Sequence, residues 1–227
     1  MKTSAGFTLL EMAIVLVIIG VLLGGLLMPL SAQVEASRIN ETKKALDEIN
    51  QALIGFAVTN GYLPCPAVSS SDGAEQTRVA GACPSRIGFL PWSALGVSQV
   101  DAWGRLYRYS AAPAFTDSVT KFTLASTGDI TIKNDNSVAN IATSIPALVM
   151  SHGVNGYYAT VAGGGAPIAD GSATNTDEDT NGSGGTTFVS KGITRSTAAV
   201  GGDYDDIVVW VSPNILFNRM VAAQKLP

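Results

Sequence analysis

Charged residues are scarce in this sequence. They form 14% of the chain, whereas soluble proteins usually carry roughly 25%. The 14 basic and 18 acidic residues leave a formal net charge of −4, so no basic face is available for a phosphate backbone. We therefore expect no binding of nucleic acid. At 227 residues the chain is long enough for one domain with its own core, or for one domain plus an extended element.

Cysteine and histidine are also rare. Cys65 and Cys83 are the only cysteines and no Cys-x-x-Cys pair occurs, so a zinc or redox site has no support in the sequence. The one histidine, His152, cannot build a multi-histidine metal site, and no nucleophile motif surrounds it. We expect no enzymatic activity, and we interpret His152 as a turn residue.

The two cysteines stand in a stretch that is rich in Pro, Gly and Ser. Their spacing suits one disulfide in an exported domain. Closing a loop near this size would stabilise the fold by about 3 kcal/mol. The alternative is a pair of free thiols.

An apolar run dominates the N-terminal part of the sequence. From Met12 to Leu30 no residue is charged, and as a helix this run would rise roughly 28 Å, which is close to the bilayer core of about 30 Å. A cleaved secretory signal is one interpretation, since Lys2 gives a positive start. However, the run exceeds the usual signal core of about 7–15 residues, and Glu11 stands at its leading edge. Both features favour a membrane helix.

The residues before this run form a specific motif. Lys2 and a short polar leader precede Gly6-Phe7-Thr8-Leu9-Leu10-Glu11. This arrangement resembles the processing site of type IV pilins and type II secretion pseudopilins. The resemblance implies that prepilin peptidase cuts between Gly6 and Phe7 and methylates the new N-terminus, so that residues 1–6 are a leader peptide. It also implies that Glu11 is the carboxylate through which the mature helix assembles.

A carboxylate at the edge of a bilayer core needs a partner. Left unpaired, Glu11 would cost on the order of 2–3 kcal/mol. Cleavage would expose the α-amine of Phe7, which would be largely cationic because such amines have a pKa near 7.7–8.0. That amine could meet Glu11 of a neighbouring subunit. The alternative is that Glu11 caps its own helix, where the macrodipole favours negative charge; the two roles are compatible.

Beyond the apolar run the sequence continues as an amphipathic helix. Apolar residues recur at spacings of three, four and seven, at Val34, Ile39, Leu46, Ile49, Leu53 and Phe56. Asn60-Gly61 followed by Pro64 predicts its end. We expect one helix from Phe7 to Thr59. Its transmembrane and polymerisation half covers 7–30, its amphipathic half covers 31–60, and a globular domain follows at 61–227.

The globular region has the features of a small antiparallel sheet. The segment from Asp101 to Tyr109 resembles the Asp-Pro-Trp-Gly segment of pseudopilins, with Ala102 in place of the proline, and predicts a turn that enters a strand. We predict an α+β, pilin-like fold in which the amphipathic half-helix packs on the sheet, and a short helix after the last strand. The strands are expected in short β-branched or aromatic runs, at Leu106–Ser110, Lys121–Ser126, Asp129–Ile132, Ala147–Ser151 and Asp206–Val211.

Acidic and amide side chains gather between Asp170 and Gly185. Asp177-x-Asp179-x-Asn181-Gly182 matches the opening of an EF-hand loop. Phe188 occupies the position of the bidentate glutamate, so Asp203, Asp205 and Asp206 would have to complete a calcium shell. The resemblance supports this candidate Ca²⁺ site, because major pseudopilins as a family hold calcium in a C-terminal loop. The alternative is a solvated loop without metal, and we expect no other cofactor.

The resemblance implies a structural subunit of a type IV pilus or of a type II secretion pseudopilus. We expect a single-pass protein of the inner membrane with a periplasmic domain, which enters the filament on assembly. The implied partners are prepilin peptidase, other pilin or pseudopilin subunits and the inner-membrane assembly platform. The size of region 61–227 favours a minor subunit. A major pilin, and a membrane-tethered adhesin or binding protein that does not polymerise, are the alternatives.

Overall fold

A computed structural model describes residues 6–135 and 140–226, without the side chains of residues 22–30. Residues 1–5 of the expected leader, and the side chains in the last part of the expected transmembrane half, lie outside the described residues. The chain forms two compact units, Met1–Asn40 and Glu41–Pro227. Over the described ranges, no helix combines the length and the hydropathy that crossing a membrane requires.

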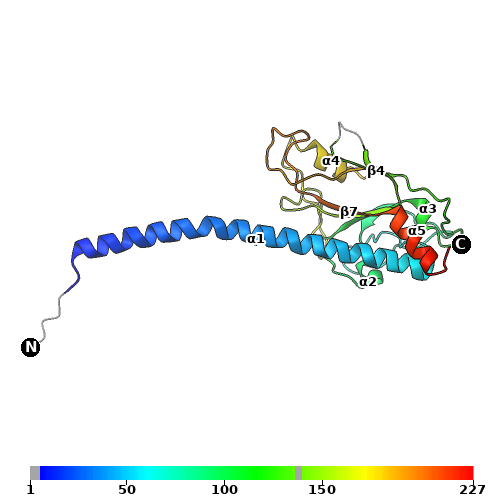
Figure 1. The fold of residues 1–227 in the computed structure, drawn as a ribbon, viewed down its shortest axis with the longest axis horizontal. Helices are drawn as coiled ribbons and strands as arrows, with labels where there is room; N and C mark the ends of the chain where they lie inside the picture. Colours follow the sequence, from blue (N-terminus) through cyan, green and yellow to red (C-terminus); the bar gives the residue numbers. More distant parts are fainter. Residues whose placement is uncertain (1–5, 136–139, 227) are drawn as a thin grey trace, which may run out of the picture. The chain divides into compact units, whose positions relative to one another are not determined.

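One long helix, α1 (Leu9–Asn60), contributes to both units (Figure 1). It ends where Gly61 adopts a left-handed φ of 83° and donates its N–H to the carbonyl oxygen of Ala57 at 2.7 Å. Glycine takes this conformation without a steric penalty, which makes it a common helix terminator. The helix predicted from Phe7 to Thr59 is therefore confirmed to within two residues at either end.

The part of α1 in the larger unit buries an apolar stripe. Leu46, Ile49 and Leu53 are fully buried, as the spacing predicted. Each contributes about 1.5–3 kcal/mol by leaving water. Ile54 and Ala57 extend the stripe toward the helix end. This packing against the sheet region is what the α+β, pilin-like prediction requires, and that prediction is confirmed.

The first sheet is antiparallel and has the order β1-β2-β5-β7. Its central strand β5 is buried along its whole length, as expected for a strand with neighbours on both sides and apolar material on both faces. The strands are β1 (Ile87–Phe89), β2 (Arg108–Ala111), β5 (Ala147–Ser151) and β7 (Ile207–Val211).

A second sheet has the order β4-β3-β6. Strand β3 pairs antiparallel with β4 and parallel with β6, so one pairing in this sheet differs from the expected antiparallel pattern. Its strands are β3 (Ile130–Lys133), β4 (Asn140–Ile145) and β6 (Thr187–Val189). An apolar cluster joins the two sheets, and it consists of Ile130, Ile132, Ile145, Leu148, Met150, Phe188 and Val208.

One predicted strand is wrong. Residues 121–126 form turns and irregular chain instead of a strand. Phe122, which gave that segment its strand-like pattern, packs against Phe115 and Phe217 with ring centroids 5.0 and 6.3 Å away. Its burial is satisfied by aromatic packing and requires no strand pairing.

Four short helices complete the described part of the larger unit, and the last of them confirms the helix expected after the final strand. They are α2 (Trp92–Leu95), α3 (Pro113–Thr116), α4 (Thr176–Gly182) and α5 (Pro213–Ala222) (Figure 1). Helix α5 starts with proline at its first turn, where the missing N–H needs no partner. It buries Leu216 and Met220, four residues apart on one face.

The predicted turn before β2 is present, and it explains the missing proline. Asp101 Oδ1 accepts the backbone N–H groups of Trp103 and Arg105, each at 3.0 Å. The N–H of Ala102 donates to the hydroxyl of the buried Thr42 on α1 at 3.3 Å. Proline has no N–H to donate, so alanine at this position allows a hydrogen bond between the turn and the helix.

Candidate functional site

The residues of the expected cleavage site precede α1 and are exposed. Gly6 and Phe7 both lie on the surface. A Cβ atom added at Gly6 would meet no other atom within 4 Å. The fold therefore leaves space for a side chain at position 6. Any requirement for glycine there comes from outside the chain.

Thr8 and Glu11 form a capping box at the start of α1. The N–H and the hydroxyl of Thr8 both donate to Glu11 Oε2 at 2.9 Å, and the N–H of Glu11 donates to the Thr8 hydroxyl at 3.2 Å. These bonds satisfy N–H groups that have no partner within the helix. Sequence reasoning recognised capping by Glu11 as one of two roles but overlooked Thr8, although Thr-x-x-Glu before an apolar run is the signature of this box. The carboxylate is also exposed, so it retains acceptor sites for a second partner.

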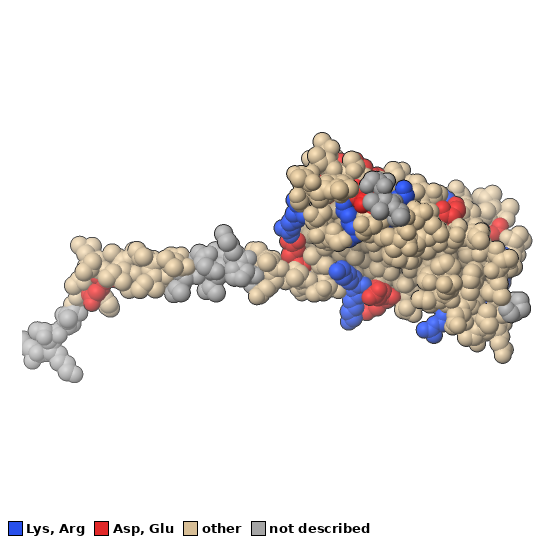
Figure 2. Space-filling model, turned by 45° about the horizontal axis from the view of Figure 1, so that its top comes forward, with Lys and Arg blue, Asp and Glu red and all other residues tan. Residues whose placement is uncertain are grey.

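The first turns of α1 expose apolar side chains on all sides. From Leu9 to Val21, the large apolar side chains are between 45% and 93% exposed, and no charge follows Glu11 in this stretch. Figure 2 shows how few charged atoms this segment presents. A helix that is apolar all round is normally buried. This surface therefore requires cover from lipid or from another protein.

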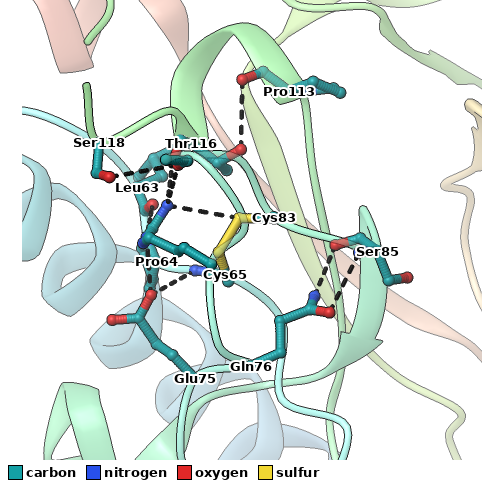
Figure 3. The surroundings of a disulfide bond; sticks show 12 residues. Leu63, Pro64, Cys65, Glu75, Gln76, Cys83, Ser85, Pro113, Thr116 and Ser118 are labelled. Carbon is teal, nitrogen blue, oxygen red and sulfur yellow. Dashed lines mark hydrogen bonds and ion pairs between the residues drawn. A yellow bond between two sulfur atoms is a disulfide. The ribbon is translucent and has the colours of Figure 1, made fainter. Parts of the chain in front are cut away.

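Cys65 and Cys83 form a disulfide, with Cα atoms 5.5 Å apart. Hydrogen bonds hold the enclosed segment from both sides (Figure 3). The N–H of Cys65 donates to Glu75 Oε2 at 2.7 Å, and the side chain of Gln76 exchanges two hydrogen bonds with the backbone of Ser85. Arg78 pairs with Glu75 at 2.8 Å and also donates to the carbonyl oxygens of Leu63 and Thr116. The disulfide is thus one part of a polar network that orders a segment with little secondary structure.

The acidic segment contains a short helix, α4, where the sequence pattern predicted a loop. Asp177, Asp179 and Asn181 lie on α4, whereas Asp203, Asp205 and Asp206 lie just before β7. On a helix, residues two apart point in different directions. The alternation that suggested an EF-hand loop therefore does not bring these side chains together.

Three of the six predicted ligands are engaged separately. Asp177 pairs with Lys191 at 2.5 Å. Asp179 Oδ1 accepts the hydroxyl of Tyr158 at 2.6 Å, and Asp203 Oδ1 accepts that of Ser172 at 3.0 Å. In the structure these carboxylates tie α4 and its neighbouring loops to the rest of the unit.

The carboxylates that do converge are Glu178, Asp205 and Asp206. Each offers an oxygen atom, and these atoms lie within 4.8 Å of one another. Glu178 and Asp206 are almost completely buried. Sequence reasoning missed Glu178 because, in the loop pattern, it falls between the ligand positions Asp177 and Asp179. In the helix it lies on the buried face, three residues before the buried Asn181.

Amide donors surround this cluster, which we call the acidic cluster. The side-chain nitrogens of Asn155 and Asn175 donate to Glu178 at 2.9 and 3.0 Å. The backbone N–H of Asn155 donates to Asp205 at 2.9 Å, and the side chain of Asn181 donates to Asp206 at 2.7 Å. These are neutral donors, so they stabilise the carboxylates without cancelling their charge.

Burial therefore disfavours the ionised form of the cluster. It raises the pKa of Asp205 from its usual 3.8 to about 7, and the nearby charges of Glu178 and Asp206 act in the same direction. Burial also raises the pKa of Glu178. Three like charges at this spacing repel one another strongly where water is excluded. Protons or a bound cation would relieve this repulsion.

Two buried oxygen atoms in this region have no hydrogen-bond partner among the described residues. They are Asp205 Oδ1 and the side-chain oxygen of Asn175. His152, which is 2% exposed, has its Nδ1 atom 3.3 Å from Asp206 Oδ1 but forms no hydrogen bond there. Carboxylate and amide oxygens are the ligands that Ca²⁺ prefers. The donor set of the acidic cluster therefore fits a hard divalent cation.

Comparison with known proteins concerns only the N-terminal segment. Residues 1–27 match the family model for the prokaryotic N-terminal methylation motif. This range contains Gly6, Phe7 and Glu11. Neither a curated protein nor a solved structure matches the chain.

Proposed function

Because residues 1–27 match the N-terminal methylation motif, we propose that the chain belongs to the family of type IV pilins and pseudopilins. Within that family, it is a minor subunit of a type IV pilus or of a type II secretion pseudopilus. A subunit of this family is processed by prepilin peptidase and assembles with other pilin subunits. In this chain the cut falls between Gly6 and Phe7. Assembly then proceeds through the first half of α1.

The exposed apolar surface from Leu9 to Val21 carries this proposal. Lipid covers it in the precursor, and the same half-helices of neighbouring subunits cover it in the filament. The filament would bury Glu11, and an unpaired charge away from water is costly. The exchange from lipid to filament is therefore favourable only if Glu11 finds a positive partner there. The terminal ammonium of Phe7 on a neighbour is that partner.

The location of the protein follows from this assembly route. Before assembly the chain spans the inner membrane once, with the domain 61–227 in the periplasm, where it meets the assembly platform. The Cys65–Cys83 disulfide is consistent with an oxidising compartment.

The size of the globular region supports a minor role. Region 61–227 builds two sheets and four short helices, which is more than the compact domain of a major pseudopilin needs. A major pilin is the second candidate, and a membrane-tethered binding protein that does not polymerise is the third.

Isolated filaments provide the test. We expect the chain in sheared filaments to begin at Phe7 with an N-methyl group, and to be far less abundant than the main subunit. N-terminal sequencing and quantitative mass spectrometry measure both quantities. An N-terminus at Met1 would argue against the proposal, as would an N-terminus at Gln33 from cleavage of a secretory signal after Ser31-Ala32, or absence from filaments. Equal abundance with the main subunit would favour a major role.

We further propose that the acidic cluster binds Ca²⁺ through Glu178, Asp205 and Asp206. The unpartnered oxygens of Asp205 and Asn175 support this assignment, as does the separation of at most 4.8 Å between the carboxylate oxygens. A bound cation would neutralise the repulsion between α4 and the segment before β7. Its role is structural, because it would hold these two segments together.

Calcium is expected to raise the melting temperature of the full-length protein in detergent. At about ten times Kd, binding to the native state alone adds about 1.4 kcal/mol, which corresponds to roughly 3–6 °C for a chain of this size. Glu178→Gln should abolish the shift relative to EDTA. Asp203→Asn is the matched control and should retain it, because Asp203 contacts Ser172 instead of the cluster. No shift in the wild type, or an equal shift in Glu178→Gln, would exclude this site.

A further inference from the structure

Arg108 occupies a core-facing position of the first sheet. It lies opposite Phe89 of β1 and opposite Met150 of β5. Directly opposed residues project from the same face of a sheet, and Met150 belongs to the apolar cluster that joins the two sheets. A guanidinium group, which stays charged in proteins, therefore projects from the face that carries the core.

This guanidinium forms no direct ion pair among the described residues. Its Nε atom is buried without a hydrogen-bond partner, and the group forms none of the ion pairs of the described chain. Asp206 acts on it electrostatically, but that carboxylate accepts a hydrogen bond from Asn181 and lies beside His152. Burial lowers the pKa of Arg108, because the charged form is poorly solvated there.

Other partly buried arginines have direct partners for their terminal nitrogens, although Arg86 Nε is unpartnered like Arg108 Nε. Arg78 pairs with Glu75, and Arg86 pairs with Asp129 through two hydrogen bonds of 2.6 and 2.8 Å. Arg105 donates to two backbone carbonyl oxygens. Arg108 makes no such direct contact, and a charge taken from water without a direct partner is costly. Packing alone does not account for an arginine at this position.

A cavity of about 190 Å³ lies next to Arg108. Its apolar wall includes Ile87, Phe89 and Leu106, and His152 and Tyr158 also line it. The cavity reaches the surface at the exposed Pro167. An engineered protein cavity of about 150 Å³ holds benzene, so this space admits a group of comparable size.

We propose that this cavity binds a carboxylate with a short apolar body, and that Arg108 is its ion-pair partner. The carboxylate would receive two N–H groups from the guanidinium fork, and the apolar body would contact Ile87, Phe89 and Leu106. This binding activity goes beyond the proposed assembly role and does not depend on it.

The charge and the lining select this ligand class. One guanidinium balances a monoanion, whereas a phosphate dianion would remain undercompensated. Tyr158 already donates to Asp179, and His152 lies against Asp206. The mainly apolar wall favours an aliphatic or aromatic body over a polar one. Such a carboxylate could be a free short-chain acid or the C-terminus of a peptide that ends in an apolar residue.

Matched pairs of probes test the charge requirement on the full-length protein in detergent. Isovalerate is compared with isovaleramide, and Gly-Gly-Leu with a free C-terminus is compared with its C-terminal amide. We expect the acid of at least one pair to raise the melting temperature and to bind in calorimetry, and its amide to bind about tenfold more weakly or worse, because the charge-assisted pair is lost. The pair that responds identifies the source of the carboxylate.

Arg108→Leu removes the charge and keeps apolar volume. We expect it to abolish the response to the acid while its melting temperature without ligand stays equal to or above that of the wild type, since a half-buried charge without a direct ion pair has been removed. Arg219→Leu, at an exposed position, is the control and should respond like the wild type. Binding of neither acid, equal binding of acid and amide, or an unchanged response in Arg108→Leu would overturn the proposal.

Discussion

Glu11→Ala is expected to leave the protein in the membrane and to remove it from filaments. The substitution leaves the terminal ammonium of a neighbouring Phe7 without its carboxylate in an apolar environment. A cost of about 2–3 kcal/mol corresponds to a roughly 30- to 150-fold loss of incorporation. Membrane fractionation and the amount of the chain in sheared filaments, each relative to wild type, measure the two outcomes.

The capping box offers a control that separates the two roles of Glu11. Glutamine at the third helical position can still accept the hydrogen bonds of Thr8, but it cannot pair with an ammonium as a carboxylate does. Glu11→Gln should therefore fail to assemble, like Glu11→Ala. Thr8→Ala should assemble, because it loses only a cap worth about 1 kcal/mol. If Glu11→Gln assembled normally and Thr8→Ala did not, capping and not charge pairing would be the function of this residue.

Loss of the Cys65–Cys83 disulfide is expected to lower the free energy of unfolding by about 3 kcal/mol. The bond restricts the unfolded chain across a sequence separation of 18 residues. The double variant Cys65→Ala, Cys83→Ala should show this loss in chemical denaturation of the full-length protein under non-reducing conditions. Wild-type protein in reductant should approach the stability of the variant.

The variant supplies its own control, because reductant should not change its stability further. A loss below about 1 kcal/mol would mean that the hydrogen bonds around Arg78 hold this segment without the disulfide. Those bonds reach Leu63, Glu75 and Thr116, on both sides of the enclosed loop. In that case the cysteines would add little to an already ordered segment.

The secondary structure was predictable wherever the signal was local. Strand β5 was predicted with its observed bounds, because Ala147–Ser151 is a continuous run that folds as one buried strand. Strand β1 was missed because it contains Gly88 within a turn-rich stretch. A Cβ at Gly88 would lie 2.4 Å from the carbonyl oxygen of Ala67, so this contact requires glycine. Because Ala67 is distant in sequence, no local signal reveals the contact.

The acidic cluster shows the same limit in the candidate sites. Asp205 and Asp206 were among the residues expected to bind calcium, and the structure brings them together with Glu178. Which of Asp177, Asp179 and Glu178 joins the acidic cluster depends on whether the segment is a loop or a helix. Its composition favoured a loop, and burial of Glu178 and Asn181 against the rest of the unit stabilises a helix.

The sequence by itself determined the N-terminal motif, the long helix and the apolar surface that must be covered, because each depends on residues that are adjacent or one helical turn apart. Only the tertiary structure decided which carboxylates meet and that Arg108 lines a cavity without forming a direct ion pair. Those features depend on strand register and on contacts between segments distant in sequence. At the acidic cluster and at Arg108, the packing of the whole unit sets side-chain burial and charge pairing. No local sequence pattern encodes that packing.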